Sequence, residues 1–240
     1  MKKIVFLIII AMISSSLFAQ AQKKQTSSET TVEQIYLSTS IEVAIATELA
    51  AADTREQKFI ALDTIGQMVS DGKIKQDDQQ INNVLTNLAG EGTFVTVREG
   101  SRKINDFPEV RARAAEILGE LGGEKSKNTL IDITVKENEP FVLAQIVYSL
   151  GVIGLNDNNE SLIAIARVLE ANSKRAPLPD DNLAVASLLA IEKIAAKNNG
   201  FPAEPDPKYL YRAIIEVQQG NYSTNVRKWA ANLITKLRQY

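Results

Sequence analysis

The sequence predicts an all-α protein in which pairs of helices stack into a solenoid. A pattern of apolar residues, best preserved in Glu109–Gly122, recurs four more times in the 240-residue chain. The other copies are Gln57–Met68, Pro140–Gly154, Asn182–Ala195 and Asn225–Leu237. Successive copies are 53, 32, 41 and 43 residues apart, and repeats built from helical hairpins have similar periods. A second amphipathic segment lies between copies, and two such helices bury both apolar faces only if pairs stack.

Each copy reads as one face of an α-helix. In the best copy the face consists of Val110, Ala114, Leu118 and Leu121, which have the spacing of a 3.6-residue period. A further aligned position is occupied by glycine in three copies, namely Gly66, Gly119 and Gly151. Glycine inside a helix costs about 1 kcal/mol relative to alanine, so its recurrence predicts a close crossing of neighbouring helices.

Val110-Arg111, Ala114-Ala115 and Leu118–Gly122 together resemble the first helix of a HEAT repeat, of the short bacterial variety called PBS-lyase HEAT-like. Asn225–Arg227 with Ala230-Ala231 is the next best copy, and the resemblance extends over residues 54–240. It implies a HEAT-like (armadillo-like) α-solenoid with a surface for partner proteins. Members of this family range from lyases to scaffolds. No catalytic motif of the family is matched, so the resemblance implies no catalytic residue.

Lys58, Arg111 and Arg227 share one position of the alignment. The resemblance implies that such a residue pairs with polar groups of adjacent repeats, and a buried charge would need such a partner in any case. Contact with a partner protein is the alternative.

The remaining helices complete the predicted solenoid, which we assign to residues 31–240 as one domain. A helix at Thr31–Ala52 would cover the first repeat, because an open solenoid end exposes apolar surface. The second helices of the repeats are predicted at Gln76–Ala89, Lys125–Glu137, Asn159–Ala171 and Pro207–Gln219.

Residues 91–106 interrupt the helical pattern. Thr93–Val97 is rich in β-branched residues, and Glu99-Gly100 is a turn signal, so we expect an inserted β-hairpin. Its tip carries Arg98, Arg102 and Lys103, a positive spot that is our first candidate for partner binding. A solvated loop without a partner is the alternative.

The N-terminus resembles a secretory signal peptide. Lys2-Lys3 precede the apolar run Ile4–Ile13, and an Ala-x-Ala site ends at Ala21, so residues 1–21 would be removed and residues 22–30 would form a flexible tether. Cleavage after Ala19 and retention as an anchor are alternatives. No cysteine follows the apolar run, which argues against a lipoprotein. We therefore expect a periplasmic or secreted protein.

Composition excludes several functions. The chain has no histidine and no cysteine, so thiol catalysis, histidine-assisted nucleophiles and almost all zinc sites are excluded. We expect no cofactor and no bound metal. Loss of Lys2 and Lys3 leaves 25 basic against 29 acidic residues, a balance that argues against a nucleic-acid partner. Asp77-Asp78, Asp180-Asp181 and Asn156–Glu160 are expected to cap helices or form turns rather than act as catalytic acids or bind calcium.

Aromatic residues concentrate in the last repeat. Tyr209, Tyr211 and Trp229 are our second set of candidates for partner binding, because tyrosine and tryptophan are enriched in binding hot spots. Core packing of Trp229 is the alternative. The sequence thus favours an exported, non-catalytic scaffold that binds a protein through the concave face and loops of the solenoid, with oligomerisation through the C-terminal helix as an option. The alternatives are a structural subunit of an envelope assembly and a carboxylate-dependent envelope enzyme.

Overall fold

The computed structural model describes residues 32–202 and 206–240, and the predicted signal peptide and tether lie outside these ranges. The described helices are α2 (Val32–Ala51), α3 (Arg55–Ser70), α4 (Gln79–Gly90), α5 (Pro108–Leu121), α6 (Gly123–Ile133), α7 (Pro140–Ile153), α8 (Glu160–Ser173), α9 (Asp181–Asn198), α10 (Lys208–Gln219) and α11 (Thr224–Leu237). Within the described ranges, no helix is both long and apolar enough to span a membrane.

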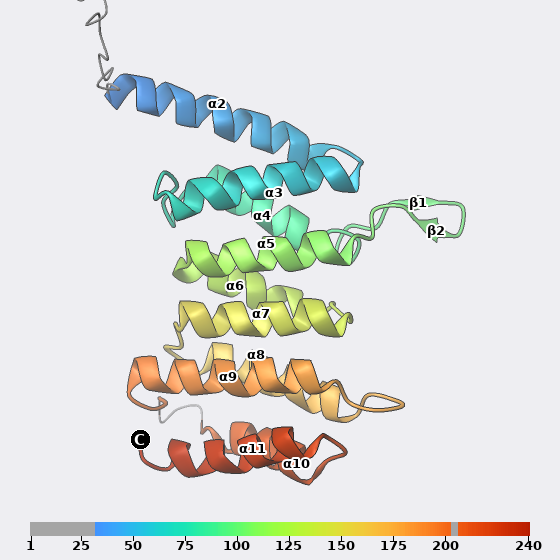
Figure 1. Cartoon of the computed structure of the whole chain (residues 1–240), viewed down its shortest axis with the longest axis vertical. Helices are drawn as coiled ribbons and strands as arrows, with labels where there is room; N and C mark the ends of the chain where they lie inside the picture. The colour runs from blue at the N-terminus through green and yellow to red at the C-terminus, as the bar shows by residue number, and fades with distance from the viewer. Residues whose placement is uncertain (1–31, 203–205) are drawn as a thin grey trace, which may run out of the picture. The chain divides into compact units, whose positions relative to one another are not determined.

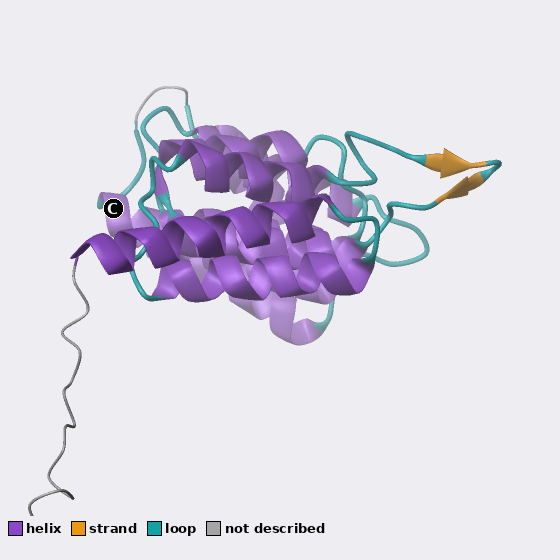
Figure 2. Cartoon of the chain, turned by 90° about the horizontal axis from the view of Figure 1, so that it is seen from above, coloured by secondary structure: helices purple, strands orange, loops and turns teal. Residues whose placement is uncertain are grey.

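The chain divides into two compact units, Met1–Ser40 and Ile41–Tyr240. The described part of the first unit is the beginning of α2, where Leu37 is exposed. In the second unit, helices α3, α5, α7, α9 and α11 follow one another side by side, with α4, α6, α8 and α10 in a layer behind them (Figure 1). Figure 2 shows the same two layers from above. The predicted α-solenoid of stacked hairpins is therefore confirmed.

The aligned positions of the five repeats form the core between the layers. The central position is completely buried in every copy, at Ala61, Ala114, Ile146, Ser187 and Ala230, and it is small in all copies except Ile146. One turn later Ile65, Leu118, Leu150 and Ile191 are equally buried, whereas Ile234 in the last helix is half-buried. The amphipathic period found in the sequence thus identified the inward face of each front helix.

The aligned glycines lie where front helices approach most closely. A Cβ placed on Gly119 would be 2.7 Å from Ser149 Cβ, and one on Gly151 would be 2.7 Å from Ala190 Cα. The predicted close crossing is confirmed at α5–α7 and α7–α9. At Gly66 the nearest atom is 3.1 Å away at Arg113 Nη2, the end of a flexible side chain. A side chain at Gly66 in the first copy would therefore have more room than one at Gly119 or Gly151.

Local signals set several helix ends as expected. Asp78 accepts a hydrogen bond from Ile81 N at 3.0 Å, and Asp180 accepts one from Leu183 N at 2.8 Å, so both act as N-caps. The predicted helix Lys125–Glu137 ends earlier than expected, at Ile133. Glu137 lies beyond this end, where its carboxylate binds a buried arginine and accepts from the N–H groups of Asn138 and Glu139.

Candidate functional site

The insertion between α4 and α5 is a small β-hairpin, as predicted. Strands β1 (Arg98–Glu99) and β2 (Arg102–Lys103) pair antiparallel around Gly100-Ser101, and Gly100 has a φ of 60°. The β-branched stretch that suggested the hairpin precedes the strands, and forms turns and a single bridge between Glu91 and Val95. The hairpin projects sideways from the stack (Figures 1 and 2).

The amide side chain of Asn105 joins the two arms of the insertion at the root of the hairpin. Asn105 Oδ1 accepts from Val97 N at 2.8 Å, and Asn105 Nδ2 donates to Val95 O at 2.8 Å. Lys103 Nζ donates to Gly92 O at 3.2 Å. These bonds join the two arms of the insertion, which makes it a held structure rather than an open loop.

A buried arginine connects this root to the helices. Arg111 Nε donates to Glu137 Oε2 at 2.6 Å, while Arg111 Nη1 donates to Asp106 Oδ1 at 2.7 Å and to Glu91 O at 3.3 Å. Burial lowers the pKa of Arg111, but the hydrogen bonds and charges of Glu137 and Asp106 outweigh burial and raise it above its usual value. Arg111 therefore stays charged and holds both ends of the insertion against α5 and the end of α6.

A second buried ion pair lies on the other side of the root. Lys58 on α3 is 5% exposed, and its Nζ is 3.0 Å from Glu91 Oε1 and 3.2 Å from Ala50 O at the end of α2. Glu91 Oε2 is buried and has no hydrogen-bond partner among the described residues. Lys58 and Arg111 thus pair with polar groups, as the resemblance implied, but chiefly with the insertion and, for Arg111, the end of its own repeat rather than with adjacent repeats. Arg227 at the same repeat position is exposed.

An open groove of about 830 Å³ lies beside these contacts, between the hairpin root, the end of α2, Lys58 of α3, α4 and α6. We call it the hairpin groove. Its apolar lining includes Leu88, Phe94, Val95, Val97, Ile104 and Ile133. Phe94, Val95, Val97 and Ile104 are each 42–68% exposed. Its ionisable lining consists of Asp53, Lys58, Glu91, Glu99 and Asp132.

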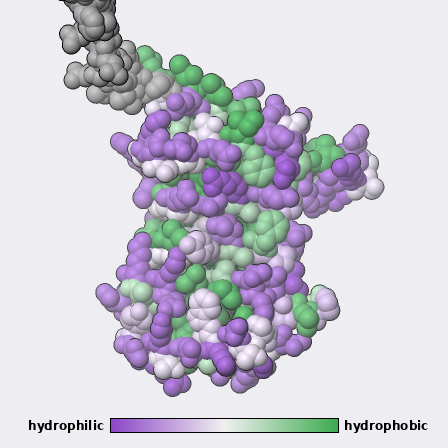
Figure 3. Space-filling view, in the orientation of Figure 1, coloured by the Kyte–Doolittle hydropathy of each residue, from purple (hydrophilic) through white to green (hydrophobic). Residues whose placement is uncertain are grey.

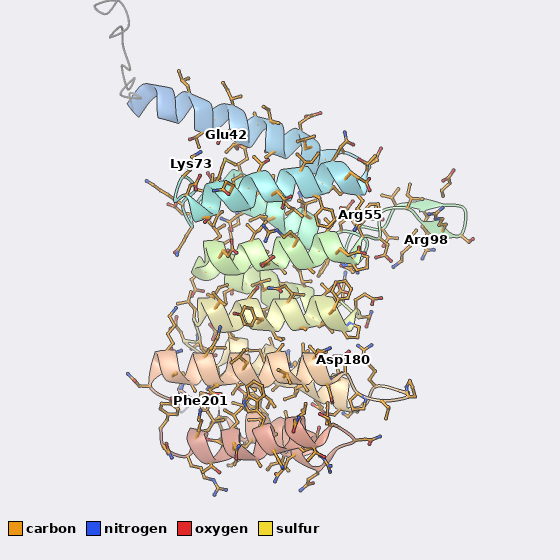
Figure 4. All side chains as sticks on the ribbon, in the orientation of Figure 1. Glu42, Arg55, Lys73, Arg98, Asp180 and Phe201 are labelled. Carbon is orange, nitrogen blue, oxygen red and sulfur yellow. The ribbon has the colours of Figure 1, made fainter. Side chains whose placement is uncertain are left out.

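In Figure 3 hydrophobic atoms gather where the hairpin joins the stack, and its outer part is mostly hydrophilic. Figure 4 places Arg55 at the start of α3, on the side of the stack from which the hairpin with Arg98 projects. An apolar concavity of this size, lined by a few polar groups, is typical of a ligand or peptide site.

The predicted basic tip is exposed, although two of its three side chains bond within the hairpin. Arg98 Nη1 donates to Ser101 O at 3.1 Å, and Lys103 turns back to the root. Arg102 is also exposed. The tip thus presents charge at the outer end of the hairpin, beyond the apolar surface at its root.

The second predicted set lies at the far end of the stack, so the structure does not bring the two sets together. Tyr209, Tyr211 and Trp229 are half-buried and pack against the core. Burial, with a smaller effect of the Glu160 charge, raises the pKa of Tyr209 to about 12. This packing against the core favours a structural role, the alternative considered for Trp229.

The polar stretch before α8 forms a turn, as expected. Asn156 Nδ2 donates to Asn159 Oδ1 at 3.1 Å, and Asn156 Oδ1 accepts from Leu162 N at 3.3 Å. Glu160 pairs with Lys127 on α6. The side-chain oxygens of Asn156, Asn159 and Glu160 are thus engaged in the turn or in the ion pair with α6.

Sequence reasoning missed the hairpin groove itself. Phe94, Val95, Val97 and Ile104 are apolar residues in an otherwise polar insertion, and the prediction used only Thr93–Val97, for its strand propensity. Lys58 and Glu91 are 33 positions apart, so their pairing becomes visible only in the folded chain.

The fold and its contacts define an α-solenoid of HEAT-like repeats with one inserted hairpin. No protein-family model and no curated protein matches the chain. A solved structure, the complex of CpcE and CpcF of phycocyanin lyase from Nostoc sp. PCC7120, matches with a TM-score of 0.53 and 17% sequence identity. The match covers 82% of this chain but 65% of the other, which is less than two thirds of its length. At this identity the likeness concerns the fold.

Proposed function

We propose that the protein is an exported, non-catalytic scaffold that binds a partner protein at the hairpin groove. The single observation that carries this proposal is the groove itself, whose apolar walls are exposed although its base is rigidly held. The structural neighbour is described as a complex of two proteins, which is consistent with partner binding by this kind of fold.

The energetics favour the groove over the basic tip. Covering a half-exposed apolar side chain is worth roughly 2 kcal/mol at ~25 cal/mol per Å², before the costs of association. Phe94, Val95, Val97 and Ile104 could each contribute on this scale. Exposed charges such as Arg102 typically contribute ~1 kcal/mol or less, and mainly affect association rate. In this proposal the groove supplies affinity and the tip steers an acidic partner surface.

Preorganisation supports the same site. Ordering a loop during association weakens binding, and a loop that is already held avoids this loss. Asn105, Arg111 and the Lys58–Glu91 pair hold the root from three sides. A partner would therefore meet a groove that is already formed.

The test compares two surface variants in affinity capture from extracts of the source cells. Val95→Lys/Val97→Lys places charges on the groove wall, and Leu178→Lys is the control, since Leu178 is an equally exposed apolar residue of a different loop, 56% exposed. We expect proteins captured by the wild type and by Leu178→Lys to be lost with the double variant. Capture of the same proteins by all three would refute the site.

Export is tested separately, by cell fractionation and mass spectrometry of the mature N-terminus. Cleavage at the predicted sites would leave a chain beginning at Gln22 or, for the earlier site, at Gln20. A chain recovered in the cytoplasm with residues 1–19 intact would contradict export.

A further inference from the structure

We infer that the hairpin groove selects a segment in which a lysine side chain is flanked by apolar residues. This inference rests on the proposed function, because it takes the occupant from a partner protein. The argument is one of charge complementarity between the occupant and the lining of the groove.

The lining has an excess of negative charge. Four carboxylates line the groove, at Asp53, Glu91, Glu99 and Asp132, against a single cation at Lys58. That cation is already neutralised, because Lys58 Nζ lies 3.0 Å from Glu91 Oε1 and also donates to Ala50 O. Besides the Lys58–Glu91 pair, an anionic occupant would therefore meet three carboxylates, and no unpaired cation among the lining residues would be there to bind it.

In addition to this excess of negative charge, Glu91 provides a specific hydrogen-bond acceptor. Its Oε2 has no hydrogen-bond partner among the described residues, although its side chain is only 16% exposed. A buried carboxylate oxygen without a donor is unfavourable, and an ammonium group brought in by the occupant would relieve it. Lys58 occupies only Oε1, so Oε2 is left to accept from a second ammonium once the Glu91 side chain turns toward the groove.

The apolar walls define the rest of the occupant. Phe94, Val97 and Ile104 face it with exposed apolar surface, and Leu88 and Ile133 lie beneath. Lys136 lies over the ring of Phe94, with Nζ 4.5 Å from the centroid, but is not part of the lining. A lysine fits this combination because its four-carbon stem is apolar and only its end is charged.

The test uses three small probes and the intact protein, with binding followed by NMR chemical shifts. Nα-benzoyl-lysine amide carries an aromatic group, peptide bonds and the lysine ammonium. Nα-benzoyl-norleucine amide is its uncharged match, and 4-phenylbutylamine is a free amine without peptide bonds. We expect the lysine probe to bind about tenfold more tightly than the norleucine probe, with the largest shifts at the lining residues.

Variants locate the effect. Asp53→Asn/Asp132→Asn removes two exposed carboxylates of the lining, and Glu91→Gln removes the acceptor charge. Asp77→Asn/Asp157→Asn is the control, because it changes net charge equally at exposed sites outside the groove. We expect the preference for lysine to fall severalfold in the first two proteins and to persist in the control. Should Glu91→Gln unfold because Lys58 loses its partner, the Asp53/Asp132 variant still decides.

Each outcome bears on the inference. Equal binding of the lysine and norleucine probes, or an unchanged preference in Asp53→Asn/Asp132→Asn, would overturn it. Binding of 4-phenylbutylamine alone would assign the groove to a small amine and overturn the partner segment. If the Val95→Lys/Val97→Lys variant loses its partner while these probes show no preference for charge, partner binding stands and the lysine preference fails.

Discussion

Replacing Gly151 by alanine tests whether the close crossing of α7 and α9 organises the stack. The new Cβ would lie 2.7 Å from Ala190 Cα and 3.0 Å from Ala190 Cβ. These atoms belong to a neighbouring helix, so the clash is relieved only if α7 and α9 move apart. Such overpacking costs about 1–3 kcal/mol, while alanine regains ~1 kcal/mol of helix propensity. We expect a net loss of up to about 2 kcal/mol in the free energy of unfolding, with ~1 kcal/mol at the middle of this range.

Gly66→Ala is the matched control, because Gly66 occupies the same repeat position in α3. Its new Cβ would meet Arg113 Nη2 at 3.1 Å and Ile117 Cδ1 at 3.5 Å. The half-exposed arginine can move aside, so the gain in helix propensity should dominate. We expect this variant to be stabilised by ~0.5–1 kcal/mol.

Urea unfolding followed by circular dichroism and tryptophan fluorescence measures both variants. With a slope of about 2 kcal/mol/M, the two midpoints should differ by roughly 1 M and lie on opposite sides of the wild type. The comparison requires that both signals report one transition, because repeat proteins can unfold in parts. A Gly151→Ala protein as stable as Gly66→Ala would refute the reasoning.

Two other predictions concern ion pairs. Arg111→Met should lower the free energy of unfolding by about 3–5 kcal/mol, because it leaves Glu137 buried without its partner. Arg113→Met is the control at a half-exposed ion pair, and should lower this free energy by ~1 kcal/mol or less. Equal urea midpoints for the two variants would contradict this prediction. Burial raises the pKa of Glu160, but hydrogen bonds, chiefly from Lys127, outweigh it and place that pKa below its usual value. Its contribution to stability is therefore complete above the unfolded-state pKa of about 4.3 and is lost as the pH falls through the folded-state value. Between pH 6 and pH 3, the unfolding temperature should fall less in Glu160→Gln than in the wild type. An equal fall in the two proteins would contradict a contribution of Glu160 to acid stability.

The sequence alone predicted only part of the candidate site. The hairpin was predicted from the β-branched stretch Thr93–Val97 and from Glu99-Gly100. Only the turn signal lies at the paired strands, because a turn is a local property of the backbone. The basic tip was likewise visible in the sequence. The groove at the hairpin root was not visible, because its walls come from α2, α4, α6 and the insertion, and contacts between separate segments leave no periodic signal.

Sequence by itself determined the repeat helices and their inward faces. An amphipathic helix needs only the spacing of Val110, Ala114, Leu118 and Leu121, and hydrophobic burial then forces such helices to stack. Tertiary structure alone decided which charges are buried, how the last-repeat aromatics pack and where an apolar groove stays open. Arg111 and Glu137 meet across 26 positions because the early end of α6 lets the carboxylate turn inward, and no local propensity specifies that meeting.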